Sequence, residues 1–398
     1  MQDFEYIVRD KCAVTSDTEF EPLFESDFPL FCGCTNDAQD SDIIAKMDFA
    51  ISKKSGVIQL KNLIPLSLLY KNGHDAGAVG ALWSEHHAEF ADFVMSFAPK
   101  NVLEIGGGHS KLALNCLAKN PNLNYTIIEP NPIKYDKIHY INGFFGESKL
   151  PSKYDCVVHS HLFEHIYKPN EFLSEIYNCL CDYPCGVGKT RERERERESK
   201  ARLIFSIPNM QKWLESKFTN TLNYEHTIFL NETVIEYLLA KNGFKILQKH
   251  YFKEHSIFFA CEKVANRDSV SKSQITLKSQ YAQNKALISE FLDFYKRKIL
   301  ELNAILEATN KPVYLFGAHL FSQFLLYNGL NSEKIISILD NNKAKQGKRL
   351  YGTRFVVESP QILRKSNALL ILNAGAYTAE IKSDILANIN AKTEIVDF

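Results

Sequence analysis

The chain has 398 residues, of which 45% are hydrophobic and 24% charged, and its 47 basic side chains balance 47 acidic ones. This length exceeds what one hydrophobic core usually holds, so two or three domains are expected. The charge balance excludes a strong pull toward nucleic acid or an anionic membrane, and no apolar run is long enough to predict membrane insertion. Nine cysteines without an apolar signal segment predict free thiols in a reducing cytoplasm, with a small molecule as the partner.

Residues 1–75 show little periodicity, so we expect a small, irregular N-terminal module. Cys32 and Cys34 are only one residue apart, which is poor spacing for two ligands of one zinc ion. The module is expected to be held together by packing of Phe20, Leu23, Phe28, Leu30, Phe31, Ile58 and Leu60.

Between residues 101 and 264, short apolar runs alternate with helical stretches, which is the pattern of a parallel sheet with crossover helices. The expected strands are NVLEIG, LNYTIIEP, YDCVVHS, ARLIFSIP and SIFFACEKV. They predict a doubly wound, Rossmann-like α/β domain over residues 76–265. Within it, GVGKTRERERERESK at residues 186–200 predicts a solvated protrusion, because alternating Arg and Glu neutralise each other locally. Its GKT is not a phosphate-binding loop, since Tyr183 stands where the first glycine is required.

The segment VLEIGGGHSKL follows the first strand and opens a helix. Gly106 and Gly108 allow close approach of a ligand, and the helix N-terminus offers unpaired N–H groups. The second strand ends at Glu129, where a doubly wound fold places a carboxylate for a ribose diol. NAD and S-adenosylmethionine both carry that ribose. S-adenosylmethionine is favoured, because Lys111 stands where a dinucleotide needs a small residue and Glu104 suits a sulfonium or amino group better than a pyrophosphate.

Tyr224, Glu225 and His226 stand side by side between two apolar stretches. Histidine can remove a proton near neutral pH, and an adjacent carboxylate can orient it. Such a base suits methylation of a carbon next to a carbonyl, and Tyr224, or Tyr70 from LLYKNGH, could stabilise the enolate oxygen. A polar turn without chemistry is the alternative. His165 is expected to be structural, and no histidine cluster has convincing metal-ligand spacing.

Residues 266–310 are polar at first and then predict a linker helix. Its apolar residues at helical spacing are Leu287, Phe291, Phe294, Ile299 and Leu302. From residue 311 the strand-like runs PVYLFGAH, KIISILDNN, TRFVV and ALLILNAG follow. They predict a second, smaller Rossmann-like domain over residues 311–398.

VLEIGGGHS, IIEP, YDCVVHSHLFEHI and LIFSIPN resemble the successive motifs of class I S-adenosylmethionine-dependent methyltransferases. The resemblance implies a cofactor site at the carboxyl ends of the strands NVLEIG, LNYTIIEP and YDCVVHS. The residues that it implies are Gly106, Gly108 and Ser110 for the methionine part, Glu129 for the ribose, Phe144 or Phe145 for the adenine, and Ser160 and His161 facing the cofactor.

Most of the chain, from Cys12 to the final TEIVDF, resembles the three-domain C-methyltransferases that act on nucleotide-linked deoxysugars, most sharply in DNNKAKQGKRLYGT. The resemblance implies that His226 is the catalytic base and is paired with Glu225, whereas the two preceding positions, Asn223 and Tyr224, differ from that family. By the same analogy, the candidates for contact with the nucleotide are Gly317, His319 and Asp340.

That family also has an N-terminal zinc ribbon with two Cys-x2-Cys pairs. The matching positions in this chain are Cys12 with Thr15, and Ser52 with Ser55. A serine hydroxyl stays protonated at neutral pH and binds zinc poorly, so bound zinc is not expected.

These observations predict a methyltransferase that uses S-adenosylmethionine to methylate a carbon of a nucleotide-linked keto-deoxysugar. The closest alternative is methylation of a sugar hydroxyl or a phosphate-type oxygen, and either activity would serve surface-polysaccharide or capsule biosynthesis. A ligand-binding protein without turnover is a further alternative. An NAD-linked oxidoreductase built on the C-terminal unit is disfavoured, because LFGAHLFSQ lacks the required glycines.

Overall fold

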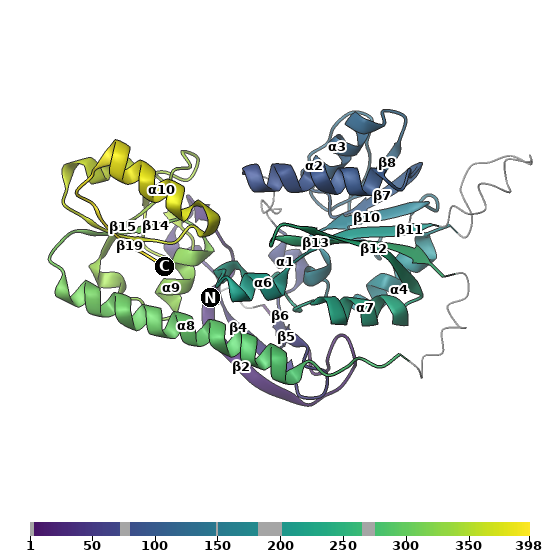
Figure 1. Ribbon diagram of the computed structural model, residues 1–398, viewed down its shortest axis with the longest axis horizontal. Coiled ribbons are helices and arrows are strands. Elements are labelled where there is room, and N and C mark those ends of the chain that lie inside the picture. The colour runs from purple at the N-terminus through teal and green to yellow at the C-terminus, as the bar shows by residue number, and fades with distance from the viewer. Residues whose placement is uncertain (1–3, 72–79, 149, 182–200, 265–274) are drawn as a thin grey trace, which may run out of the picture.

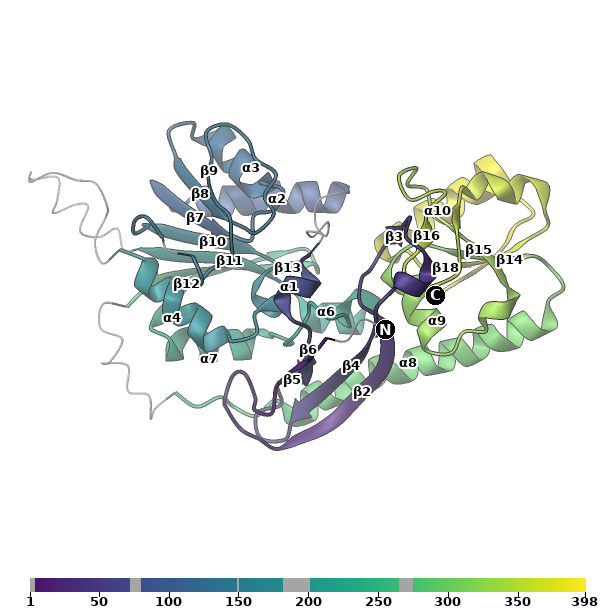
Figure 2. The same ribbon diagram turned by 180° about the vertical axis from the view of Figure 1, so that it is seen from behind.

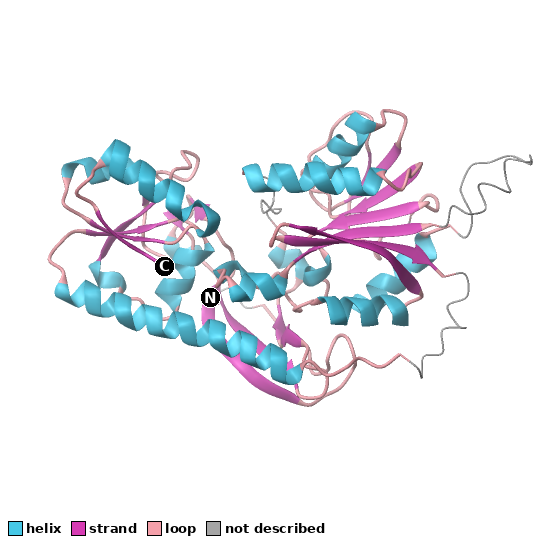
Figure 3. Ribbon diagram, viewed as in Figure 1, coloured by secondary structure: helices cyan, strands magenta, loops and turns pink. Residues whose placement is uncertain are grey.

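The structure, a computed structural model, describes residues 4–71, 80–148, 150–181, 201–264 and 275–398. It contains a central α/β domain, a β-rich N-terminal module and a smaller C-terminal α/β domain (Figures 1 and 3). The Arg-Glu segment at residues 186–200 lies outside the described residues. No helix in the described part of the chain combines the length and apolarity needed to cross a bilayer.

The central domain is built on a mixed, seven-stranded sheet with the order β12-β13-β11-β10-β7-β8-β9. As predicted, β7 pairs in parallel with β8 and β10, and β10 with β11. β13 instead runs antiparallel to both of its neighbours, β11 and β12. A short turn joins it to β12, and such a turn connects antiparallel strands. The strands are β7 (Asn101–Ile105), β8 (Asn124–Ile128), β9 (His139–Ile141), β10 (Cys156–Ser160), β11 (Arg202–Pro208), β12 (Phe244–Phe252) and β13 (Ser256–Lys263).

The sequence does not predict β9 or β12. β9 has only three residues, and most side chains of the edge strand β12 are half-buried or exposed. Neither strand therefore forms the continuous apolar run by which a buried parallel strand is recognised.

Helices cover both faces of this sheet because alternate strand residues point to opposite faces. Leu103 and Ile105 pack into a core with α4 and α7, whereas Val102 packs into a second core with α2 and α3. The helices and helical turns are α2 (Ala81–Met95), α3 (Lys111–Lys119), η2 (Phe163–His165), α4 (Pro169–Cys179), α6 (Met210–Glu215), η3 (Thr219–Thr221) and α7 (Glu232–Lys241).

The N-terminal module is more regular than predicted. An antiparallel sheet of β2 (Phe20–Pro29), β4 (Ile44–Ser52) and β5 (Ile58–Leu60) forms its body. Two prolines and several acidic residues interrupt the alternating pattern of β2, which hides this strand in the sequence. The remaining elements are β1 (Ile7–Val8), β3 (Cys34–Thr35), η1 (Gln39–Ser41), β6 (Asn62–Leu63) and α1 (Leu66–Leu69).

The C-terminal domain contains the predicted second parallel sheet, with the order β17-β15-β14-β18-β19. Its strands are β14 (Val313–Phe316), β15 (Ile335–Leu339), β17 (Val357–Glu358), β18 (Leu369–Leu372) and β19 (Glu394–Asp397), with β16 (Arg349–Leu350) outside this sheet. Its helices and helical turns are α9 (Leu320–Tyr327), η5 (Ser332–Lys334), η6 (Pro360–Lys365), η7 (Gly375–Tyr377), α10 (Thr378–Asp384) and η8 (Ile385–Ile389).

α8 (Tyr281–Ala308), predicted as a linker helix, shares one hydrophobic core with the N-terminal sheet, α6 and the C-terminal sheet. Figures 1 and 2 show it running along the N-terminal sheet and the C-terminal domain. The N-terminal module also joins the C-terminal domain directly, through pairing of β3 with β16 and a bidentate ion pair of Arg349 with Asp42 at 2.5 and 2.9 Å. The three parts are therefore packed into one unit.

We predict that Phe291→Ala lowers the free energy of unfolding by about 3–5 kcal/mol, because the cavity would open in the core shared by all three parts. Phe291 is fully buried on α8, whereas Leu300 on the same helix is 64% exposed. Urea denaturation of both alanine variants measures the difference. A similar, small effect at both positions would contradict the shared core.

Candidate active site

The turn after β7 brings backbone to the carboxyl end of the central sheet. Gly106 has a φ of +79°, and the amide N–H of Gly106 donates to Ile128 on β8 at 3.0 Å. A Cβ on Gly107 would lie 2.7 Å from the Glu104 carboxyl carbon, so this position also requires glycine, although the sequence analysis names only Gly106 and Gly108. A Cβ on Gly108 would lie 3.7 Å from the Glu129 carboxyl carbon, which places the predicted ribose acid against the turn.

Glu104 supports this turn from beneath. Its carboxylate is buried and accepts a hydrogen bond from the Tyr125 hydroxyl at 2.9 Å. Burial raises the pKa of Glu104 to about 7. The prediction that Glu104 lines the open cofactor cleft is therefore not met by this geometry.

Ser110 also faces away from the cleft. It is 1% exposed, and its hydroxyl contacts the Ile133 carbonyl at 3.0 Å and the Tyr140 hydroxyl at 2.9 Å. The prediction that Ser110 lines the methionine part is therefore wrong for its side chain, which holds the loop after β8 in place.

Tyr70 is linked to Glu129, the predicted ribose-binding residue, through Asn131. Glu129 accepts from the Asn131 backbone N–H at 3.1 Å, and the Asn131 side chain donates to the Tyr70 carbonyl at 3.2 Å. The Tyr70 ring lies 6.4 Å from the Phe144 ring, centre to centre. Phe145 packs against Phe172 in the domain core instead, so Phe144 is the better candidate to border the adenine.

Ser160 is the last residue of β10 and His161 follows it, at the carboxyl end of the sheet, while contact with the cofactor stays a prediction. The Ser160 hydroxyl contacts the Ser206 hydroxyl at 2.9 Å, and His161 Nε2 contacts the Ser256 hydroxyl at 2.7 Å. His161 has a φ of +47°, and its ring lies 4.8 Å from Trp83 of α2. Trp83 gives no signal in the sequence, since an aromatic residue on an amphipathic helix is usually part of a core.

The loop that carries His226 is held by an asparagine turn. The Asn223 side-chain oxygen accepts from the backbone N–H groups of Glu225 and His226 at 2.8 and 2.9 Å. His226 is 8% exposed, and its Nδ1 lies 3.1 Å from the Thr221 carbonyl. The Asn223 side-chain nitrogen, which only donates, also lies 3.2 Å from Nδ1, whereas the Thr221 carbonyl only accepts. The role of a base needs the tautomer with the proton on Nδ1 and the lone pair on Nε2. Thr221 and Asn223 both contact the ring at Nδ1, and the pairing of His226 with the Glu225 carboxylate stays a prediction.

Tyr224 does not belong to the site. It is 3% exposed, and its hydroxyl donates to the carbonyls of Phe28 and Ala45 at 3.1 and 2.5 Å. The prediction that Tyr224 could stabilise an enolate is therefore wrong, because this side chain is inserted into the N-terminal sheet. Tyr70, the second candidate, is still available to stabilise an enolate.

Glu225 lies where the three parts of the chain meet. Burial raises the pKa of Tyr70, and the charge of Glu225 adds to this shift. The same charge also acts on Cys32 of the N-terminal module and on His319 of the C-terminal domain. Leu222 and Tyr224 of the His226 loop lie in the core that the N-terminal module shares with the C-terminal domain.

Glu164 and His165, expected to be structural, lie beside His226. The rings of His165 and His226 are 5.5 Å apart, and the Tyr70 hydroxyl lies 3.4 Å from His165 Nδ1. One ligand atom each of Glu164, His165 and His226 lies within 4.8 Å of the others, a grouping that could hold a metal ion. The sequence does not predict this cluster, because its members come from two distant segments.

The predicted nucleotide contacts lie at the carboxyl end of the C-terminal sheet. Gly317 has a φ of +102°, and the side chain of His319 is exposed. Asp340 instead ties its own turn together, accepting from Ala318 N at 3.0 Å and from Lys345 Nζ at 3.0 Å. The Asp340 carboxylate is thus already engaged by the protein.

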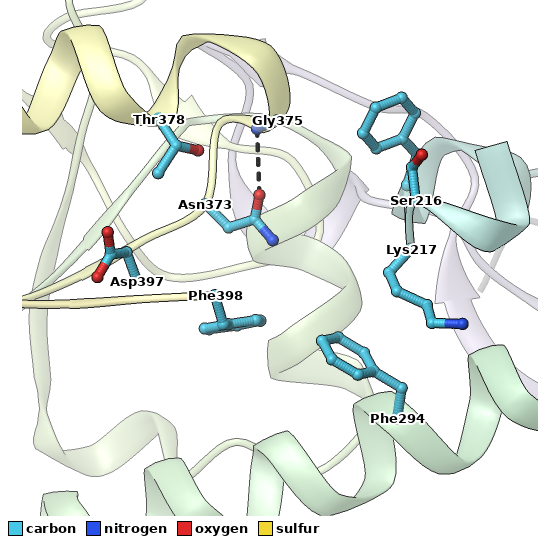
Figure 4. Close-up of a pocket in the computed structure, with 9 residues that line it drawn as sticks. Ser216, Lys217, Phe294, Asn373, Gly375, Thr378, Asp397 and Phe398 are labelled. Atoms are coloured by element: carbon cyan, nitrogen blue, oxygen red, sulfur yellow. Dashed lines mark hydrogen bonds between the residues drawn. The ribbon is translucent and has the colours of Figure 1, made fainter. Parts of the chain in front are cut away.

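A pocket of about 510 Å³ opens beside the end of β18, between the central and C-terminal domains (Figure 4). The Asn373 side chain accepts from the Gly375 N–H at 3.1 Å within it. Its lining residues are Ser216, Lys217, Phe218, Phe294, Asn373, Gly375, Thr378, Asp397 and Phe398. The sequence predicts a strand at ALLILNAG. It does not indicate that the end of this strand borders a pocket.

The four positions that match zinc ligands lie together as a hydrogen-bonded cluster. Cys12 Sγ lies 3.7 Å from the Ser55 hydroxyl, which lies 2.8 Å from the Ser52 hydroxyl. Ser52 donates to Asp17 Oδ1 at 2.6 Å, and Thr15 donates to the other oxygen of Asp17. One thiol and three hydroxyls do not fit the donor set of a structural zinc site.

We predict that this cluster stabilises the N-terminal module without metal. Ser52→Ala should lower the free energy of unfolding by about 1–3 kcal/mol, because buried partners lose their hydrogen bonds. The exposed Ser26 hydroxyl on β2 offers a control in Ser26→Ala. A chelator should leave the melting temperature unchanged, and a large drop on chelation, or stoichiometric zinc in the purified protein, would contradict this assignment.

Two family models match the chain. Residues 80–249 match a methyltransferase domain, and residues 264–396 match the C-methyltransferase C-terminal domain. No curated protein matches the chain significantly.

Similar solved structures are also methyltransferases. The dimethyltransferase RosA of N,N-8-amino-8-demethyl-D-riboflavin from Streptomyces davawensis is 19% identical, over 45% of this chain and 55% of that one, with a TM-score of 0.36. The plantazolicin methyltransferase BpumL in complex with SAH is 13% identical, over 46% and 84%, with a TM-score of 0.35. The N-methyltransferase NodS from Bradyrhizobium japonicum WM9 is 13% identical, over 46% and 97%, with a TM-score of 0.33. The chain thus spans about half the length of RosA, and scores this low support no further argument.

The assignment rests on the family match to the central domain and on its seven-stranded mixed sheet, which is typical of Rossmann-like methyltransferases. These findings identify residues 80–249 as a class I, S-adenosylmethionine-dependent methyltransferase domain, and the chain as a methyltransferase.

Proposed function

We propose that the chain methylates a carbon atom next to the carbonyl of a nucleotide-linked keto-deoxysugar, with His226 as the base. The observation that carries this proposal is the placement of His226. Its loop adjoins Tyr70, which contacts the cofactor side through Asn131, and packs into the core shared with the domain that matches the C-methyltransferase C-terminal domain. A capsule or other surface polysaccharide is the expected destination of such a sugar.

The glycine turn and Glu129, which lie side by side at the carboxyl end of the sheet, suit the adenosyl part of S-adenosylmethionine. Backbone at Gly108 comes close to the Glu129 carboxylate, which is half-buried and can accept hydrogen bonds from a ribose diol. When bound, this cofactor supplies an electrophilic methyl group. The protein's part is to hold the acceptor carbon in line with that group.

Three groups divide the work on the acceptor. His226 Nε2 removes the proton from the carbon next to the carbonyl. The Tyr70 hydroxyl donates to the carbonyl oxygen as negative charge develops there. Trp213, whose ring lies 6.0 Å from that of His226, provides an apolar wall that limits access of water.

The nucleotide part of the acceptor fits the crevice at the ends of β14 and β18. The chain passes from β14 to β15 on one side and places β18 on the other, and open α/β sheets bind ligands at such a switch point. Gly317 and His319 follow β14, whereas Asn373 and Gly375 follow β18. Asp340 follows β15 and is a weaker candidate, since its carboxylate is engaged.

We predict that Glu129→Ala weakens S-adenosylmethionine binding by about 10- to 100-fold, which corresponds to the loss of about 1.5–3 kcal/mol from hydrogen bonds to a charged group. Isothermal titration calorimetry measures this change. Glu171→Gln is the matched control, since Glu171 is an exposed residue of α4 that pairs with Lys168. Equal affinities of both variants and the unmodified protein would place the cofactor elsewhere.

We predict that His226→Ala lowers methyl transfer by about 10²- to 10⁴-fold and abolishes deuterium exchange next to the carbonyl, because both need the base. The assay uses labelled S-adenosylmethionine with a panel of nucleotide-linked keto-sugars, and NMR locates the new methyl group. His139→Asn, an exposed histidine on β9, is the control.

A methyl group found on an oxygen atom, with no exchange in the unmodified enzyme, would replace this proposal with O-methylation of a sugar hydroxyl or a phosphate-type oxygen. Binding of S-adenosylmethionine without turnover of any acceptor in the panel would instead favour a ligand-binding role.

A further inference from the structure

Glu164 is a buried carboxyl group that the proposed function leaves unused. Its side chain is fully buried in the turn after β10, and neither oxygen has a hydrogen-bond partner among the described residues. Burial raises the pKa of Glu164 to about 8, and the charge of Glu225 adds to this shift. An ionised carboxylate without donors is costly inside a protein, so this group requires a proton or a cation.

The backbone fixes Glu164 next to the catalytic loop. The backbone N–H of Thr227, the residue after His226, donates to the Glu164 carbonyl at 2.9 Å, and the Thr227 hydroxyl contacts the same carbonyl at 3.3 Å. Glu164 and His226 therefore cannot separate without breaking these bonds. A buried group held this closely to the base can act on the same reaction.

The side chain of Glu164 points toward two imidazoles. Its Oε1 lies 3.8 Å from His165 Nε2 and 3.8 Å from His161 Nδ1. The His161 branch leads away from the acceptor, since His161 Nε2 contacts Ser256. The His165 branch leads to the acceptor, since His165 Nδ1 lies 3.4 Å from the Tyr70 hydroxyl.

We propose that Glu164 is a positioning residue that supplies a proton, through His165 and Tyr70, to the carbonyl oxygen of the acceptor. This proposal rests on the proposed C-methylation. The gap of 3.8 Å between Glu164 and His165 must shorten by somewhat less than 1 Å, as is common for catalytic hydrogen bonds once the substrate binds. The titratable groups around Glu164 are His161, His165, His226, Tyr70 and Glu225.

His226 Nε2 takes the proton from the carbon, and the electron pair of that bond moves to the carbonyl oxygen. Tyr70 gives its proton to this oxygen, His165 gives its Nδ1 proton to Tyr70, and Glu164 gives its proton to His165 Nε2. The result is an enol, a protonated His226 and a Glu164 carboxylate. When the enol carbon accepts the methyl group, the hydroxyl proton returns along the same path and the ketone forms again.

The first experiment needs no acceptor. Infrared spectroscopy of the full chain with bound S-adenosylhomocysteine should show a protonated carboxylic acid at pH 7 that is missing from Glu164→Gln. NMR of the histidine ring nitrogens should show His165 neutral, with its proton on Nδ1. An ionised Glu164, or one equivalent of divalent metal that is lost in Glu164→Gln, would overturn the proposal, the second result in favour of a site formed by Glu164, His165 and His226.

The second experiment measures the reaction. Glu164→Gln should lower deuterium exchange and methyl transfer by about 10²-fold, because glutamine can donate a hydrogen bond but cannot release a proton. In the unmodified enzyme, activity should fall as the pH rises through about 8, since Glu164 then loses its proton, and Glu164→Gln should lack this decline. Affinity for S-adenosylmethionine should be unchanged, and Glu171→Gln again serves as the control.

The two failures are distinguishable. If the unmodified enzyme neither exchanges nor methylates a keto-sugar carbon, the proposed function is wrong and the relay falls with it, whatever the infrared result. If the unmodified enzyme does both, and Glu164→Gln retains its rate and the decline above pH 8, only the relay is wrong.

Discussion

The position of the catalytic loop depends on a tyrosine that takes no part in the chemistry. The Tyr224 hydroxyl reaches two carbonyls of the N-terminal sheet, and its ring lies in the core shared with α8 and the C-terminal sheet. His226 is two residues away, so anchoring Tyr224 holds His226 at the junction of the three parts. Because the anchor lies in a well-packed core, a shift of the N-terminal module would move the base.

In the proposed reaction, this dependence gives the N-terminal module a part in positioning the base, although the module provides no proposed reacting group. In related proteins the sequence resemblance implies a zinc ribbon, whereas here Cys12, Ser52, Ser55 and Asp17 form a buried hydrogen-bonded cluster. Hydrogen bonds among satisfied buried groups can keep a turn in place, although each contributes modestly. The packing of the module against α8 and the C-terminal domain supplies the rest of its stability.

Sequence patterns predicted the parts of the fold that rest on local periodicity. The buried strands β7, β8, β10 and β11 form continuous apolar runs, and the glycine turn lies beside Glu129, as the two motifs suggest. The sequence did not predict β12, because this edge strand is half polar. Without the β12–β13 hairpin, the antiparallel direction of β13 could not be predicted either. In the second parallel sheet, β14, β15 and β18 were predicted because they are largely buried apolar runs, whereas the more exposed β19 was not.

The sequence did not predict the directions in which the side chains of the candidate site point. Tyr224 and His226 are two residues apart, yet one enters the N-terminal sheet and the other lies beside His165. Ser110 and Phe145 likewise stand in the expected motifs but point into packed regions. Glu164 looks structural in its motif, and only the folding of a distant loop against it gives it a reactive neighbour.

The account depends on one cleft for the adenosyl group and another for the nucleotide of the acceptor, with His226 between them. The most direct measurement is a crystal structure of the full chain with S-adenosylhomocysteine and a nucleoside diphosphate. The ribose of the adenosyl group is expected to contact Glu129, and the diphosphate is expected to lie at the ends of β14 and β18. A diphosphate bound at the Gly106–Gly108 turn, or an adenosyl group bound in the C-terminal domain, would contradict it.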